Sequence, residues 1–83
     1  MPTVYILRCA DGTFYTGYAM DLEQRCAAHN DGRGARYTAG RRPVRVVYSE
    51  ACPTVSHALR REHALKRLTR AGKEALIERG AAS

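Results

Sequence analysis

The segment TVYILRCADGTFYTGY, residues 3–18, constrains the fold more than any other part of the chain. Residues 3–8 and 13–18 are β-branched and aromatic runs, the composition that strands favour. Asp11-Gly12 between them is typical of the turn in a β-hairpin. The sequence therefore predicts a hairpin close to the N-terminus.

The length of the hairpin loop decides which tyrosines share a face. A three-residue loop with Gly12 in the left-handed region places Tyr5 opposite Gly17 and Tyr15 opposite Leu7. A two-residue loop would place the two phenols on opposite faces. In the first register the phenols are diagonal neighbours that can contact one ligand, and Gly17 leaves a gap where a substrate backbone can approach. The alternative is that aromatic residues simply favour strands and that the glycine marks a bulge.

The rest of the chain predicts one α+β domain over residues 1–83. Helix, strand, helix and helix are expected in that order at residues 21–32, 44–50, 54–70 and 73–79. The expected order ββαβαα gives a three-stranded antiparallel sheet flanked by helices. Gly72 is expected to separate the last two helices and Gly80 to end the chain's last helix. The core is expected over residues 4–77, with residues 80–83 as a flexible tail.

Charge favours a nucleic-acid partner. The chain carries 14 Lys and Arg against 8 Asp and Glu, a net charge of +6, and its cations other than Lys66 and Lys73 are arginines. The arginine fork matches phosphate oxygens, although many small proteins are basic without a specific reason. No apolar run is long enough for a membrane span or a signal peptide. Three widely spaced cysteines indicate reduced thiols and a cytoplasmic protein.

The first expected helix carries two polar residues on its apolar stripe. Leu22, Arg25, Cys26 and His29 follow the spacing i, i+3, i+4 and i+7. The guanidinium and the imidazole are therefore expected to project side by side toward the sheet. For the histidine alone, a hydrogen-bonded core residue is the usual outcome.

The second long helix carries a carboxylate in the middle of its apolar stripe. The stripe consists of Val55, Ala58, Leu59, Glu62, Leu65 and Leu68. A carboxylate at such a position must be paired, protonated or bound to a metal, because burial without a partner costs several kcal/mol. Glu62 could bridge to Arg25 as an internal ion pair, or it could hold a divalent cation.

Together, these side chains suggest one chemistry. Tyr5, Tyr15, Arg25, His29 and Glu62 come from separate elements and are all expected to point toward the same face of the sheet. A metal anchor, a cation for developing charge and a proton acceptor for water are what phosphodiester hydrolysis needs.

The same residues carry a resemblance to a known family. VYI at residues 4–6, YTG at 15–17, Arg25-x3-His29 and Glu62 resemble the motifs of the GIY-YIG nuclease domain. The similarity extends from about residue 4 to residue 77, and the sequence is similar to the small stand-alone GIY-YIG proteins of bacteria. The chain departs from the family pattern in reading Val-Tyr instead of Gly-Ile-Tyr. Its only asparagine is Asn30, whereas many nuclease members carry one in the last helical region.

The resemblance implies a metal-dependent endonuclease acting on DNA or RNA. It implies that Tyr5 and Tyr15 are the two motif tyrosines, Arg25 the catalytic arginine, His29 a catalytic position and Glu62 the metal ligand. The metal would be Mg²⁺ or Mn²⁺, held weakly without substrate because one carboxylate cannot form a closed site. Tyr5 would orient or deprotonate the attacking water, with Tyr15 and His29 as alternative bases.

Basic residues after the first helix are expected to contact the substrate. The segment GRGARYTAGRRP is expected to be a loop without regular structure. The expected basic rim consists of Arg33, Arg36, Tyr37, Arg41, Arg42 and Arg45. The tyrosine could stack on a base, and the opposing interpretation is a solvated loop. DNA is preferred to RNA, specificity would come from substrate shape or a protein partner, and a monomer or weak dimer is expected.

Three other functions remain open at this point. The first is a nucleic-acid binder on the same fold without turnover. The second is a zinc site made by Cys26, His29, His57 and His63, whose spacing fits no usual pattern. The third is a small interaction protein in which the polar residues only stabilise the core.

Overall fold

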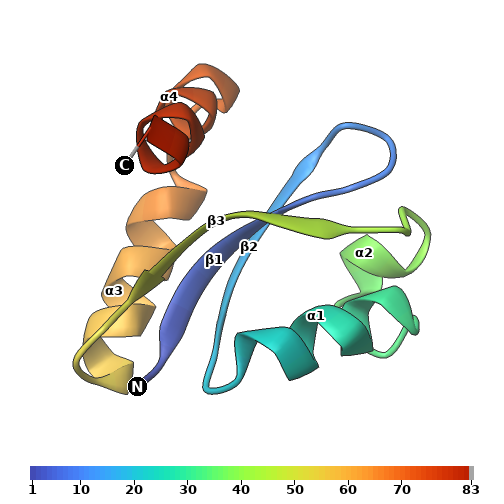
Figure 1. The fold of residues 1–83 in the computed structure, drawn as a ribbon, viewed down its shortest axis with the longest axis horizontal. Helices are drawn as coiled ribbons and strands as arrows, with labels where there is room; N and C mark the ends of the chain where they lie inside the picture. The colour runs from blue at the N-terminus through green and yellow to red at the C-terminus, as the bar shows by residue number, and fades with distance from the viewer. Residues whose placement is uncertain (83) are drawn as a thin grey trace.

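The computed structural model describes residues 1–82 and has a three-stranded antiparallel sheet in the order β2-β1-β3, with helices around it (Figure 1). Its elements are β1 (Thr3–Arg8), β2 (Phe14–Ala19), α1 (Leu22–Asn30), α2 (Arg36–Ala39), β3 (Arg45–Ala51), α3 (Val55–Lys66) and α4 (Arg70–Ala82). The predicted α+β fold class is confirmed. Within residues 1–82, no helix is both long and apolar enough to cross a membrane, and Cys9, Cys26 and Cys52 are free thiols.

The β1–β2 hairpin has the register of the three-residue loop. Tyr5 pairs with Gly17 and Leu7 with Tyr15. Gly12 has a φ of +84°, the left-handed conformation that glycine adopts without strain. The Asp11 carboxylate stabilises the turn by accepting hydrogen bonds from the backbone N–H and the hydroxyl of residue 13, at 3.1 and 2.6 Å.

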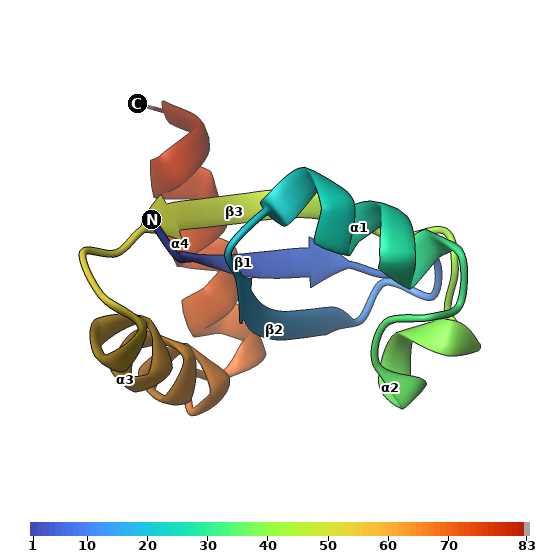
Figure 2. The same ribbon diagram turned by 90° about the horizontal axis from the view of Figure 1, so that it is seen from below.

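Alternation along the strands divides the core into two clusters on opposite faces of the sheet. One cluster consists of Tyr5, Leu7, Cys9, Ala19 and Val44, with Leu22 and Cys26 of α1 packed against it. The other consists of Val4, Ile6, Cys52, Ala58 and Leu65, with Leu76 and Ile77 of α4 packed against it. Thus α1 covers one face, and α3 and α4 cover the other (Figure 2).

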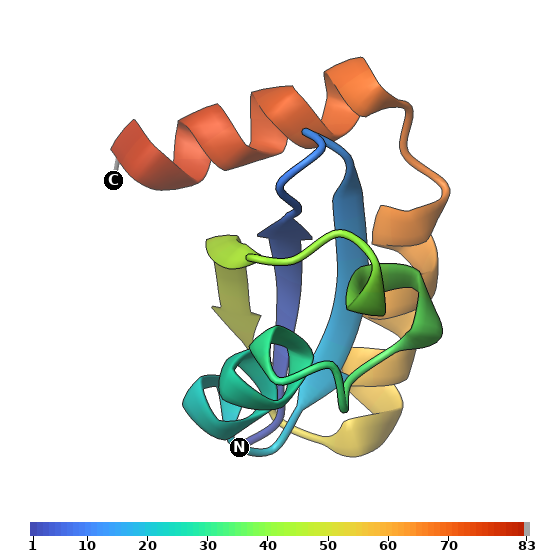
Figure 3. The same cartoon turned by 90° about the vertical axis from the view of Figure 1, so that its right-hand side faces the viewer.

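Helix α3 lies beside the edge strand β2 (Figure 3), and it contacts β2 and β1. Its Thr54 cap accepts a hydrogen bond from the backbone N–H of residue 57. Ala58 and Leu65 are buried, whereas Val55, Leu59 and Leu68 are 43%, 47% and 39% exposed. The predicted apolar stripe therefore includes side chains that the structure leaves partly in solvent, because α3 buries only the part of that stripe around Ala58 and Leu65.

Three expectations about helix boundaries are wrong. The loop after α1 contains the short helix α2, and the break between the last two helices falls at residues 67–69. Gly72 lies inside α4, where its backbone N–H donates to the Thr69 hydroxyl at 3.1 Å and so caps that helix. Gly80 does not end the helix, which continues to Ala82; of the predicted flexible tail, only Ser83 lies outside the described residues.

Candidate active site

Gly17 allows the Tyr5 phenol to lie across the edge strand β2. A Cβ atom at residue 17 would stand 2.7 Å from the Tyr5 hydroxyl and 3.3 Å from a ring carbon of Tyr15. The expectation of a gap beside Gly17 for a substrate backbone is therefore wrong, because the phenol of Tyr5 fills that space. Gly17 is therefore needed to make room for the Tyr5 ring inside the protein. The Tyr5 hydroxyl lies over β2, the strand that α3 contacts.

His29 lies in the last turn of α1 and is 1% exposed. Its Nε2 atom is 3.1 Å from the Tyr5 hydroxyl, and its Nδ1 atom is 2.7 Å from the Thr38 hydroxyl. The Tyr15 ring is tilted against the imidazole, with 5.2 Å between the centroids. The structure therefore joins both motif tyrosines to the histidine.

Burial keeps Tyr5 and His29 neutral near pH 7. Loss of solvation raises the pKa of Tyr5 to about 12; the nearby Tyr15 and Glu62 act in the same direction, and Arg25 opposes them. Loss of solvation, together with the Arg25 charge, lowers the pKa of His29. The resting pair is thus a protonated phenol beside an uncharged imidazole.

Arg25 and Glu62 approach Tyr5 from different helices. The charge of each acts on the Tyr5 hydroxyl, although α1 and α3 lie on opposite faces of the sheet. The expectation that all five side chains point toward one face is therefore wrong for Glu62, because α3 packs beside β2 and on the face opposite α1. The Glu62 charge nevertheless acts on the Tyr5 phenol.

The internal ion pair between Arg25 and Glu62 is absent from the described residues. The Glu62 carboxylate instead lies 3.6 Å from the Lys66 ammonium one turn later. The Arg25 side chain is exposed and has no hydrogen-bond or ion-pair partner within residues 1–82. Beside it lies a surface hollow of about 340 Å³, whose lining includes Arg33. The Arg25 guanidinium therefore remains available to a ligand, whereas Glu62 would have to give up its contact with Lys66.

The carboxylate of Glu62 suits a hard divalent cation. Its side chain is 19% exposed, and its one ion pair within residues 1–82 is with the Lys66 ammonium at 3.6 Å. No group of three or more His, Cys, Asp or Glu side chains within the described residues could hold a metal ion. This result leaves the zinc site of Cys26, His29, His57 and His63 without support. A single carboxylate fits a cation that keeps most of its water and also binds a substrate phosphate.

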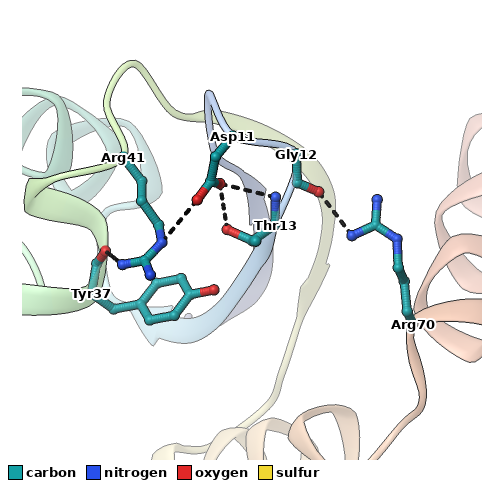
Figure 4. A network of polar contacts seen from close by, with 6 residues as sticks. All are labelled: Asp11, Gly12, Thr13, Tyr37, Arg41 and Arg70. Carbon is teal, nitrogen blue, oxygen red and sulfur yellow. Dashed lines mark hydrogen bonds and ion pairs between the residues drawn. The ribbon is translucent and has the colours of Figure 1, made fainter.

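Several residues of the expected basic rim have partners inside the protein. Arg33 pairs with Asp31 at 2.8 Å, and Arg42 donates to the Ala39 carbonyl oxygen at 2.8 Å. Arg41 pairs with Asp11 at 3.0 Å and donates to the Tyr37 carbonyl oxygen at 2.8 Å (Figure 4). The remaining two arginines, Arg36 and Arg45, are exposed, and their side chains have no hydrogen-bond or ion-pair partner within residues 1–82.

The hairpin turn is held from two sides by arginines. Figure 4 shows Arg41 on the α2 side and Arg70 on the α4 side of the turn. Arg70 donates to the Gly12 carbonyl oxygen at 2.9 Å and lies 4.8 Å from the centroid of the Phe14 ring. These contacts fix the strands that carry the two motif tyrosines.

Tyr37 packs against the site instead of presenting a free ring. It stacks on Tyr15 with a centroid distance of 6.0 Å, and the Arg41 guanidinium lies 4.1 Å from its ring centroid. The ring is 39% exposed, so part of it still reaches solvent. The expected stacking surface is therefore partly used by the protein itself.

Comparison with known proteins identifies the family. Residues 1–75 match the family described as the GIY-YIG catalytic domain. The chain belongs to the GIY-YIG family. A UPF0213 protein of Halobacterium salinarum is 51% identical over 93% of this chain and 100% of its own length. A UPF0213 protein of Staphylococcus aureus is 52% identical over 90% of this chain and 92% of its own length.

Two solution NMR structures show related GIY-YIG chains with the same fold. A UPF0213 protein from Bacillus halodurans has a TM-score of 0.60 at 46% identity, covering 94% of this chain and 84% of its own. A protein from E. faecalis has a TM-score of 0.65 at 42% identity, covering 98% of this chain and 86% of its own. The chain is thus a member of the GIY-YIG family that resembles these small proteins over most of their length.

Sequence reasoning missed two residues that shape the GIY-YIG site. Thr38 is fully buried against His29. Asn30 exchanges hydrogen bonds with the backbone of Val44 at 2.7 and 3.0 Å and so fixes the segment before β3. Neither residue has an apolar or charged pattern that marks it. A threonine inside a Gly-rich segment close to a stripe histidine is the one available signal for Thr38.

Proposed function

We propose that this protein is a metal-dependent endonuclease that hydrolyses phosphodiester bonds in DNA, or in RNA. The observation that carries the proposal is the 3.1 Å contact between the Tyr5 hydroxyl and His29 Nε2, with the charges of Arg25 and Glu62 both acting on that phenol. Membership of the GIY-YIG catalytic domain family supports the same reaction class. The +6 net charge supports a nucleic-acid substrate.

Arg25 is the residue suited to stabilise the phosphate. Its guanidinium is free of protein partners within residues 1–82 and lies beside the hollow of about 340 Å³. A planar guanidinium donates paired hydrogen bonds to phosphate oxygens, and these bonds strengthen as negative charge develops in the transition state. Removal of such a donor costs about 10²- to 10³-fold in rate.

Tyr5 and His29 provide a route for the proton of the attacking water. The water proton passes to the Tyr5 oxygen while the phenol proton passes to Nε2 of His29, 3.1 Å away. The products of this step are a hydroxide, which attacks phosphorus, and an imidazolium. A phenol whose pKa is raised to about 12 is a poor anion, so the transfers must be concerted.

Glu62 is the residue that would hold Mg²⁺ or Mn²⁺. When bound there, a divalent cation would polarise the phosphate and stabilise its negative charge. The Glu62 carboxylate oxygen lies 3.6 Å from the Lys66 ammonium. Glu62 would give up this contact and take the cation in its place, which requires only movement of the two side chains. Weak binding is expected in the absence of substrate, since the protein offers a single carboxylate.

The test is cleavage of labelled single-stranded, duplex and branched DNA and of RNA, with Mg²⁺, Mn²⁺ or EDTA. We expect Glu62→Gln to lower the cleavage rate by about a thousandfold, since metal-ion stabilisation contributes several kcal/mol. Glu74→Gln is the matched control, because Glu74 also forms an i, i+4 ion pair, with Arg70 at 2.9 Å. It is expected to keep the wild-type rate.

Two outcomes would contradict the nuclease. Cleavage that survives in Glu62→Gln and Tyr5→Phe would come from a contaminant. Salt-sensitive binding without cleavage in either metal, unchanged in Glu62→Gln, would indicate the alternative function, a nucleic-acid binder without turnover.

A further inference from the structure

The segment between α1 and α2 folds closely over the His29 imidazole. A Cβ atom at Gly34 would stand 2.2 Å from Nδ1, so only glycine permits this approach. The Thr38 side chain is 0% exposed, and its hydroxyl is 2.7 Å from Nδ1 and 2.9 Å from the Ala35 carbonyl oxygen. The backbone N–H of Ala35 is also directed at Nδ1, at 3.4 Å. The ring is therefore held on the side away from Tyr5.

Counting hydrogens assigns the tautomer. A carbonyl oxygen only accepts, so the single hydrogen of the Thr38 hydroxyl must point to the Ala35 oxygen, 2.9 Å away. The 2.7 Å contact between this hydroxyl and Nδ1 then needs a hydrogen on Nδ1. In the opposite tautomer the hydroxyl would donate to Nδ1 and leave two oxygens 2.9 Å apart with no hydrogen between them. In return, the Nε2–H tautomer gains only a 3.4 Å hydrogen bond, which the Ala35 N–H would donate to Nδ1.

We infer that Thr38 is a positioning residue that holds His29 as the Nδ1–H tautomer, so that the Nε2 lone pair faces the Tyr5 hydroxyl. The chain of donors then runs from Tyr5 to His29, from His29 to Thr38 and from Thr38 to the Ala35 carbonyl oxygen. Every donor in this chain uses one hydrogen. The effect on catalysis rests on the proposed function, whereas the tautomer does not.

The test of the tautomer is ¹⁵N NMR of the imidazole nitrogens at a pH where His29 is neutral. We expect the wild-type protein to show a protonated Nδ1 and an unprotonated Nε2. Thr38→Val removes the acceptor while keeping the shape, and we expect its Nδ1–H signature to be lost or mixed with the other tautomer. Thr38→Ser keeps the hydroxyl and is expected to restore the wild-type signature.

Thr16→Val is the matched control. Thr16 is 3% exposed, and its hydroxyl has no hydrogen-bond partner within the described residues. The same substitution there should leave the His29 signature unchanged. An Nε2–H tautomer in the wild-type protein would overturn the inference, and so would an unchanged signature in a folded Thr38→Val. If Thr38→Val does not fold, Thr38→Ala, which also lacks the hydroxyl, gives the deciding spectrum.

Kinetics separate this inference from the proposed function. If the protein cleaves nucleic acid, Thr38→Val should lower kcat by about 10- to 100-fold with KM little changed, as expected for a residue that orients a catalytic group. Thr38→Ser should recover the rate. A tautomer that responds to Thr38 in a protein with no cleavage would refute the nuclease while supporting the positioning role.

Discussion

The two faces of the sheet are built from neighbouring residues of the same strands, yet they differ in what they bury. The face under α3 and α4 buries Val4 and Ile6, each 0% exposed, among apolar partners. The face under α1 buries Tyr5 and His29, 2% and 1% exposed, together with Thr38. Strand β1 therefore contributes Val4 and Ile6 to an apolar cluster on one face and Tyr5 to a polar cluster on the other.

This difference shows how so small a chain can fold and still hold reactive groups. Burial of apolar surface contributes about 25 cal/mol per Å², and the cluster under α3 and α4 stabilises the fold in this way. The α1 face buries hydroxyls and an imidazole, which cost stability unless each is hydrogen-bonded. The hydrogen bonds among Tyr5, His29 and Thr38 keep that cost low.

The largest expected effect comes from a cavity in the apolar face. Leu65→Ala removes a side chain that is 2% exposed, and we expect the free energy of unfolding to fall by about 2–5 kcal/mol. Leu59→Ala on the same helix removes a side chain that is 47% exposed and should cost less than about 0.5 kcal/mol. Urea denaturation measures both. Equal losses in the two variants would show that α3 packs differently.

A substitution in the polar face should separate stability from geometry. Gly17→Ala places a Cβ atom 2.7 Å from the Tyr5 hydroxyl, and the phenol must move away from His29. We expect a loss of about 1–3 kcal/mol in unfolding free energy and an altered His29 imidazole spectrum. Gly40→Ala is the control, since nothing lies within 4 Å of its Cβ position. An unchanged spectrum in Gly17→Ala would contradict the need for glycine at this position.

The fold could be predicted from sequence because its signals are local. Gly12 after Asp11 specifies the three-residue loop, and the loop specifies the register that joins Tyr5 to Gly17. Reading Gly72 as a helix breaker misplaces the start of α4, because the Thr69 hydroxyl caps the helix by accepting a hydrogen bond from the Gly72 N–H. The sequence offers both signals close together, and a pattern alone does not rank a threonine cap above a glycine.

The candidate site could be predicted in its members but not in its contacts. Stripe positions indicated His29 and Glu62, but periodicity gives only the face of a helix that meets the sheet. It does not show that α3 sits beside β2 or that Glu62 meets Lys66 instead of Arg25. Thr38 reaches His29 through a loop closure, and local patterns carry no information about such closures.

The smallest expected effect is a pH dependence that belongs to the polar face. Burial lowers the pKa of His29 below its ordinary value of 6.5, so the folded protein resists a proton that the unfolded chain accepts. The free energy of unfolding should therefore fall as the pH drops below about 6.5, by at most about 1.4 kcal/mol per pH unit. Urea denaturation between pH 8 and pH 5.5 measures this slope.

Two variants test which face of the sheet carries the group that causes the pH dependence of the unfolding free energy. His29→Gln removes the titrating group and should flatten the dependence, although it lowers stability overall. Leu65→Ala should lower the whole curve and keep its slope, because that residue lies in the cluster on the face of the sheet opposite α1, which carries His29. The matched control is His63→Gln, the same substitution at an exposed histidine of α3. A slope that persists in His29→Gln would mean that the imidazole is not the group whose protonation the folded state resists.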